Sequence, residues 1–151
     1  MRRKGILFVI LYTSLIFCYS CSSSDSSKHH NLKNNEFKKG DYNFSFSDSL
    51  GSKLIDGTMT LDTNAENFSG SYQVTQKYVD SFQGLSTMKG MLSGTYSKMD
   101  NKLFINMNPK LADANVFING KVYRDSLVGE WNFTTMMGVQ MKGSFIAIPK
   151  E

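Results

Sequence analysis

The chain has 151 residues, which suits one domain and is too short for two domains with separate cores. Its formal net charge is +4, but Arg2, Arg3 and Lys4 lie at the extreme N-terminus. Removing these three lowers Lys plus Arg from 17 to 14 against 13 acidic residues, which leaves +1. A nearly neutral chain lacks the electrostatic surface that binds a phosphate backbone, so we expect no nucleic-acid partner.

Residues 1–20 have the layout of a secretory signal peptide. A basic start precedes an apolar run from Gly5 to Phe17, and the small residue Ser20 stands directly before Cys21. The apolar run is shorter than the roughly 20 residues that a membrane-spanning helix needs. We therefore expect residues 1–20 to direct export and then to be removed.

The pair Ser20-Cys21 resembles the lipobox of bacterial lipoproteins, in which a small residue precedes an invariant cysteine. The resemblance implies that the Cys21 thiol receives a diacylglyceryl group, and that acyl chains such as palmitate anchor the mature protein in the cell envelope. In a Gram-negative cell this means the outer membrane, facing the periplasm or the surface. Cys18 is the poorer lipid acceptor because the bulky Phe17 precedes it. The alternative is an uncleaved signal anchor with two incidental cysteines.

The segment that follows Cys21 is polar. Residues 22–40 read SSSDSSKHHNLKNNEFKKG, with Leu32 and Phe37 as the apolar side chains of size. A segment with so little to bury does not offset its ordering entropy. We expect residues 21–40 to be a lipidated cysteine with a disordered tether, and residues 41–151 to be the folded domain. His29 and His30 lack the further ligands of a metal site, so no metal is expected.

From Asp41 onward, apolar and polar residues alternate with a period of two, which is typical of half-buried antiparallel strands. Turn residues such as Asp100-Asn101 and Met137-Gly138 separate about eight such runs. No window supports a long amphipathic helix. The pattern predicts an all-β domain: a single antiparallel up-and-down meander of about eight strands that closes into a small barrel.

A glycine followed two residues later by an aromatic residue recurs along the chain, as in Gly70-Ser71-Tyr72, Gly94-Thr95-Tyr96, Gly129-Glu130-Trp131 and Gly143-Ser144-Phe145. The two residues of each pair share one face of a strand. A glycine there lets the strand bend, and a neighbouring ring can cover the bare backbone. Repetition of the motif around a sheet favours curvature and closure.

Residues 41–151 resemble the calycin group of lipocalin-like and avidin-like barrels. Lipocalins carry Gly-x-Trp on their first strand, whereas Gly129-Glu130-Trp131 stands late here, so the resemblance is confined to architecture. A barrel of this size can hold one small apolar molecule in its mouth, and we expect a ligand of this kind. Seven bulky side chains are expected to face inward, where they either line a pocket for that ligand or fill the barrel: Phe44, Phe46, Tyr72, Tyr96, Trp131, Phe133 and Phe145.

Catalysis has little support in the sequence. Residues 41–151 contain no His and no Cys, which excludes Ser-His-Asp and Cys-His catalysis and the usual zinc sites. The acids Asp80, Asp100, Asp125 and Glu130 are scattered near turns and outward faces, unlike the paired carboxylates of glycosidases. We expect a non-enzymatic binding protein without a cofactor, bound to the membrane through Cys21.

The sequence leaves two classes of binding function open. One is a small apolar ligand inside the barrel. The alternative is a protein-interaction module of the cell surface, such as an adhesin or an inhibitor of an envelope enzyme. An empty apolar cavity favours the first, and a packed interior with an exposed aromatic or methionine patch favours the second.

Eight methionines lie beyond residue 40 and bear on the same question. They permit three interpretations: ordinary core packing, a pliable binding surface or a copper(I) site. Core packing is the favoured interpretation. These methionines are Met59, Met88, Met91, Met99, Met107, Met136, Met137 and Met141.

Overall fold

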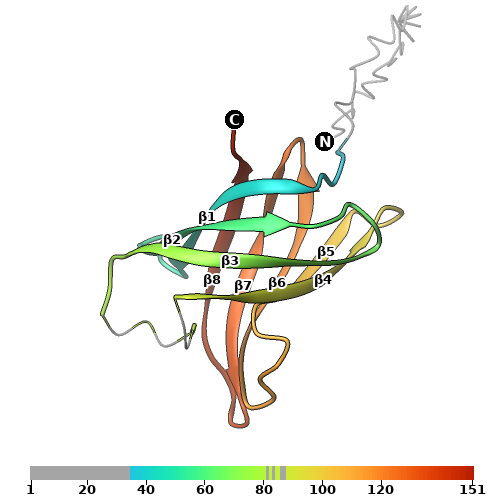
Figure 1. The fold of residues 1–151 in the computed structure, drawn as a ribbon. Helices are drawn as coiled ribbons and strands as arrows, with labels where there is room; N and C mark the ends of the chain where they lie inside the picture. Colours follow the sequence, from blue (N-terminus) through green and yellow to red (C-terminus); the bar gives the residue numbers. More distant parts are fainter. Residues whose placement is uncertain (1–34, 81, 83, 86–87) are drawn as a thin grey trace, which may run out of the picture. The chain divides into compact units, whose positions relative to one another are not determined.

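The computed structural model describes residues 35–80, 82, 84–85 and 88–151. These residues form eight antiparallel strands and no helix (Figure 1). The strands are β1 (Gly40–Asp48), β2 (Lys53–Leu61), β3 (Asn67–Lys77), β4 (Lys89–Ser97), β5 (Lys102–Asn106), β6 (Ala114–Tyr123), β7 (Ser126–Thr135) and β8 (Gly138–Pro149). The predicted signal peptide, Cys21 and the two histidines lie outside the described residues.

The strands follow one another around a closed barrel. Each strand pairs with the next in the sequence, and β8 pairs back onto β1, with Phe46 opposite Phe145. Closure therefore joins the first strand to the last. The predicted all-β class, the up-and-down order and the closure into a barrel are confirmed.

Successive connections lie at alternate ends of the barrel, which gives the molecule two distinct ends. We call the end where residues 35–40 meet the barrel the proximal end; it carries the turns after β2, β4 and β6. The distal end carries the connections after β1, β3, β5 and β7. Gly51 and Gly138 take positive φ angles of 87° and 94° in two of the distal turns, where a side chain at Cβ is disfavoured.

The interior is built from alternate residues of all eight strands, as the period of two predicts. Trp131 on β7 is completely buried and stacks on Phe46 of β1, with ring centroids 5.2 Å apart and an interplanar angle of 7°. Its indole N–H donates a hydrogen bond of 2.8 Å to the backbone carbonyl of Ser47. The Trp131 side chain thus connects β7 to β1 across the barrel.

The glycines of the repeated motif lie where strands approach most closely. A Cβ at Gly143 would overlap with the backbone carbonyl oxygen of Ser47, so β8 and β1 close at this distance only without a side chain there. A Cβ at Gly94 would overlap with the ring of Phe68 on the adjacent strand. These contacts agree with the predicted role of glycine in closure and of a neighbouring ring in covering it.

The domain begins earlier than the predicted boundary at residue 41. Phe37 is 2% exposed, and its ring centroid lies 4.9 Å from those of both Phe68 and Tyr96. Tyr42 donates a hydrogen bond of 2.7 Å to the carbonyl of Lys38. The assignment of residues 35–40 to a disordered tether was therefore wrong, because one aromatic side chain in this polar stretch closes the proximal end.

A second aromatic side chain covers the distal end. Phe82, in the connection between β3 and β4, is 4% exposed and contacts Trp131 edge to face, with centroids 5.5 Å apart. It also contacts Phe46, at 6.4 Å. Leu85 of the same connection is buried as well. Segments outside the strands thus close both ends of the barrel.

Candidate functional site

The side chains predicted to hold an apolar ligand lie in the packed core. All seven are buried, from 0% exposure at Phe46 and Trp131 to 8% at Phe133. They belong to one cluster that also contains the end-closing rings of Phe37 and Phe82. The aromatic set therefore fills the barrel between its two closed ends.

Exposed apolar side chains gather instead at the distal end. Met136 and Met137, in the turn between β7 and β8, are 85% and 89% exposed. Leu50, in the turn between β1 and β2, is 93% exposed. Leu111 and Val139 on neighbouring segments are partly exposed too. A single exposed apolar residue is ordinary, whereas a group of them at one end of a barrel indicates a contact surface.

A surface pocket of about 630 Å³ lies within this group. Its apolar lining is Phe133, Met136, Met137 and Met141, which we call the methionine patch. Asp113 also lines the pocket, so the loop after β5 adjoins the turn after β7, and the two extend together beyond the barrel (Figure 1). Methionine side chains adapt to varied apolar shapes, which suits a surface that receives another molecule.

The loop beside the methionine patch is held by a buried amide. Asn115 is 4% exposed and donates hydrogen bonds to the carbonyls of Asn108 and Leu111, at 2.8 and 3.3 Å. Its Oδ1 accepts a hydrogen bond from the backbone N–H of Asn108. Because Asn115 starts from the rigid strand β6, these bonds fix the loop that flanks the patch.

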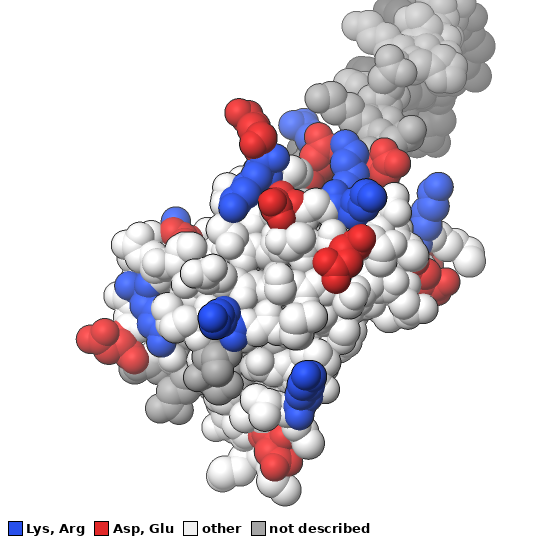
Figure 2. All heavy atoms as spheres, viewed as in Figure 1, with Lys and Arg blue, Asp and Glu red and all other residues white. Residues whose placement is uncertain are grey.

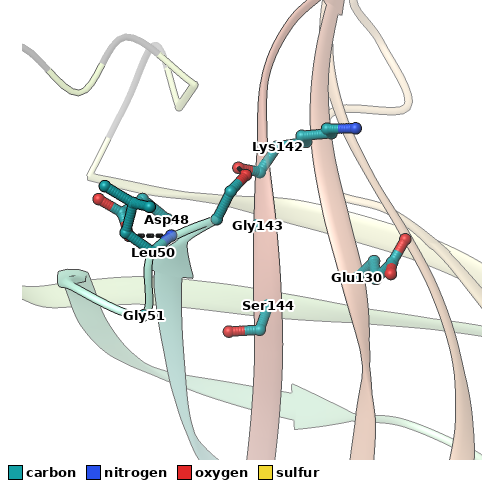
Figure 3. A pocket seen from close by; sticks show the side chains of 8 residues that line it. Asp48, Leu50, Gly51, Glu130, Lys142, Gly143 and Ser144 are labelled. Carbon is teal, nitrogen blue, oxygen red and sulfur yellow. Dashed lines mark hydrogen bonds between the residues drawn. The ribbon is translucent and has the colours of Figure 1, made fainter.

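Another distal pocket, of about 550 Å³, lies between the turn after β1 and the wall of β7 and β8 (Figure 3). Asp48 accepts backbone hydrogen bonds from Leu50 and Ser52, both 2.8 Å, and so shapes the turn. Ser49 Oγ donates to the carbonyl of Lys142 on β8. The turn is therefore tied to the barrel wall, and its exposed Leu50 has a fixed position.

One polar network on the outer wall shifts pKa values. The Asp56 carboxylate accepts hydrogen bonds from Ser45 Oγ and Tyr78 OH, both 2.6 Å, and from Lys53 Nζ at 3.1 Å. Burial acts to raise the pKa of Asp56, but the three hydrogen bonds outweigh it and leave the pKa below its usual value. The hydrogen bond to Asp56 raises the pKa of Tyr78. The network attaches the end of β3 to β1 and β2.

The lowered pKa of Asp56 predicts a loss of stability in acid. A carboxyl with a folded-state pKa below its unfolded value of about 4 stabilises the fold above that pH, and the contribution disappears as the pH falls through the folded-state pKa. Between pH 7 and pH about 3, wild type should lose more free energy of unfolding than Asp56→Asn, by at most about 1 kcal/mol for a carboxylate that is partly exposed to solvent. Urea unfolding at both pH values measures the difference.

The control is Glu130→Gln, since the Glu130 carboxylate makes no hydrogen bond within the described part of the chain. This variant should follow the wild-type acid profile. Equal acid sensitivity of wild type and Asp56→Asn contradicts the assigned role of the network.

The surface carries mixed charge. Acidic and basic side chains are interspersed on the face shown in Figure 2, without a patch of one sign. Within residues 35–151 as described, no three His, Cys, Asp or Glu side chains come together as a metal site. In the same part of the chain, no helix is long and apolar enough to cross a membrane.

No known protein family, curated protein or solved structure matches this chain. The sequence predicted a turn at Met137-Gly138, whereas the turn consists of Met136 and Met137, and Gly138 is the first residue of β8. The favoured interpretation of the methionines as core packing is wrong for Met136 and Met137, which are exposed, so the methionine patch was not predicted. The sequence feature that could have indicated the patch is the pair of adjacent methionines in a turn, where polar residues are usual.

Proposed function

We propose that the protein is a non-enzymatic, lipid-anchored binding protein of the cell envelope, and that it contacts a protein partner through the methionine patch. The single observation that carries the proposal is the contrast between a filled barrel and an exposed methionine turn. Of the two classes that the sequence left open, this contrast favours the protein-interaction module. The absence of His and Cys after residue 40 supports a role without catalysis.

The methionine patch and the start of the described chain lie at opposite ends of the barrel. The chain that carries Cys21 reaches the barrel at the proximal end, where Asn35 Oδ1 accepts a hydrogen bond from the backbone N–H of Arg124. Lys38 forms an ion pair with Asp125 at the same end. The methionine patch lies at the opposite end. In this proposal the patch meets an apolar segment of another envelope protein at the end of the barrel opposite to residue 35.

The anchor predicts a difference between two cysteine variants. Cys21→Ala should abolish labelling by a palmitate analogue, because the thiol that receives the lipid is lost. Cys18→Ala should keep the label. Metabolic labelling followed by gel fluorescence checks both, and label retained by Cys21→Ala refutes the anchor.

The partner contact predicts a loss of binding on polar replacement of the patch. The double variant Met136→Ser and Met137→Ser should lose a partner that wild type retains, since the two most exposed apolar side chains of the patch become polar. Cross-linking in intact cells, then direct titration with the purified partner, measures the loss. We expect binding to weaken at least about tenfold, equivalent to about 1.4 kcal/mol.

The matched control is Met99→Ser. Met99 is 93% exposed, but it lies in the turn after β4 at the proximal end. This variant should bind as wild type does. A partner that Met99→Ser and the double variant retain equally overturns the assignment of the patch. An apolar small molecule that co-purifies with all three proteins supports the other class.

A further inference from the structure

The outer wall of β4 to β7 carries an aromatic pair among uncharged polar side chains. Phe104 on β5 lies opposite Thr95 on β4 and Asn119 on β6. Phe117 on β6 lies opposite Asn106 on β5 and Asn132 on β7. All of these point outward, because the intervening residues of each strand are buried in the core.

The two rings form a stacked aromatic pair on the outer wall. Phe104 and Phe117 stack with centroids 5.8 Å apart and an interplanar angle of 22°, and Phe104 is 37% exposed. Phe104 contributes nothing to the barrel interior, which its neighbours Leu103 and Ile105 fill. Its free edge and face are therefore available to a ligand.

Phe104 borders a groove of about 270 Å³ on this wall. Thr95 and Asn119 flank the ring, and Glu66 and Lys102 contribute one charge of each sign. Within the described residues, the side chains of Thr95 and Asn119 make no hydrogen bond. The groove thus joins an apolar ring to donors and acceptors that are satisfied by solvent alone.

Some outward polar groups elsewhere on the wall bind one another. On β1 to β3, Thr60 Oγ1 donates to Asp41 at 2.6 Å, and Ser69 Oγ donates to Asp62 at 3.1 Å. Ser45 donates to Asp56 in the network described above. Thr58 and Gln73 on β2 and β3 also make no side-chain hydrogen bond within the described residues, so the wall around Phe104 is distinguished by the exposed ring that lies beside such groups.

We propose that this groove binds a neutral, unbranched glycan chain. A sugar ring presents an apolar C–H face, which packs on an aromatic ring, and peripheral hydroxyl groups, which need both donors and acceptors. The Asn119 amide supplies two donors and an acceptor, and the Thr95 hydroxyl supplies one donor and acceptor. The balanced charges of Glu66 and Lys102 suit a ligand without net charge. This site is distinct from the methionine patch and does not depend on the proposed protein partner.

The test uses the full-length protein, purified in detergent. Retention on cellulose and calorimetric titration with cellohexaose measure binding, and N-acetylchitohexaose in a second titration reports whether acetamido groups are accepted. Phe104→Ala and Asn119→Ala should each weaken binding at least about fivefold, as expected for loss of one packing or hydrogen-bonding contact. Phe104→Tyr keeps the ring and should bind within about threefold of wild type.

The control is Tyr123→Ala, which removes another half-exposed aromatic side chain from β6, outside the groove. It should bind as wild type does. Thermal unfolding of every variant verifies the fold. Wild type that binds neither oligosaccharide overturns the proposal, as does Phe104→Ala that remains folded and binds with wild-type affinity. Binding of either oligosaccharide that Phe104→Ala loses supports it.

Discussion

Trp131→Ala is expected to lower the free energy of unfolding by about 3–5 kcal/mol, a large share of the stability of a small domain. The substitution removes the largest buried side chain of the core and leaves a cavity between Phe46 and Phe82. It also leaves the carbonyl of Ser47 without the indole donor. Urea unfolding followed by far-ultraviolet circular dichroism measures the loss without requiring tryptophan fluorescence.

Trp131→Phe separates the two contributions. A phenyl ring still packs on Phe46 but cannot donate to Ser47, so we expect a smaller loss of about 1–3 kcal/mol. Phe104→Ala, which removes a ring that stacks on Phe117 on the outer wall, should lower the free energy of unfolding by about 1 kcal/mol or less. In wild type, the emission of this single tryptophan should be blue-shifted and should move to the red on unfolding. A loss below about 1 kcal/mol for Trp131→Ala contradicts its burial.

Phe37→Ala should have the second-largest effect, a loss of about 3 kcal/mol. The substitution exposes the rings of Phe68 and Tyr96, which Phe37 covers at the proximal end. A chain that begins at residue 41 lacks the same ring. Its free energy of unfolding should fall by at least as much as that of Phe37→Ala. Thermal and urea unfolding of the two, beside a chain that begins at residue 35, measures both effects.

Met99→Ala provides the control at the same end of the barrel, because its side chain is almost fully exposed. Its unfolding midpoint should match that of wild type. Equal stability of the chains that begin at residues 35 and 41 would mean that residues 35–40 do not belong to the folded domain.

The sequence predicts the strands well because each strand repeats a two-residue pattern. Tyr42, Phe44 and Phe46 alternate with polar neighbours, and the structure buries all three. One departure occurs at β8, where Val139 is 58% exposed although the alternation places it inward. The register of β7 and β8 shifts between Phe133 and Thr134. The alternation of inward and outward residues is therefore displaced by one position at this end of the hairpin.

Phe37 and Phe82 could not be assigned from the sequence. Each is an isolated aromatic residue in a polar segment, and a single residue has no periodicity. The position of each ring is determined by the end of the barrel that it covers. That end forms only after the eight strands have paired into a closed sheet. The interior location of the seven aromatic residues was predictable from alternation, but whether they line a cavity depends on the rings that enter from outside the strands.

The methionine patch and the Phe104 groove could likewise be predicted only in part from the sequence. The alternation places Phe104 on the outer face, but its stacking on Phe117 depends on the register of β5 and β6. The clustering of Met136 with Met141 and Asp113 depends on how two connections meet at one end. Contacts between neighbouring strands and loops, rather than single residues, create both surfaces.

The pairing of β1 with β8 also governs when the protein can fold. A ribosome makes β1 early and its partner β8 last, so the growing chain is an open sheet whose two unsatisfied borders invite association with other chains. The seam also includes a hydrogen bond from the N–H of Lys150, directly after β8, to the carbonyl of Asp41. Closure of the barrel therefore waits until β8 has been made, and until then the edge of β1 lacks the strand that covers it in the folded protein.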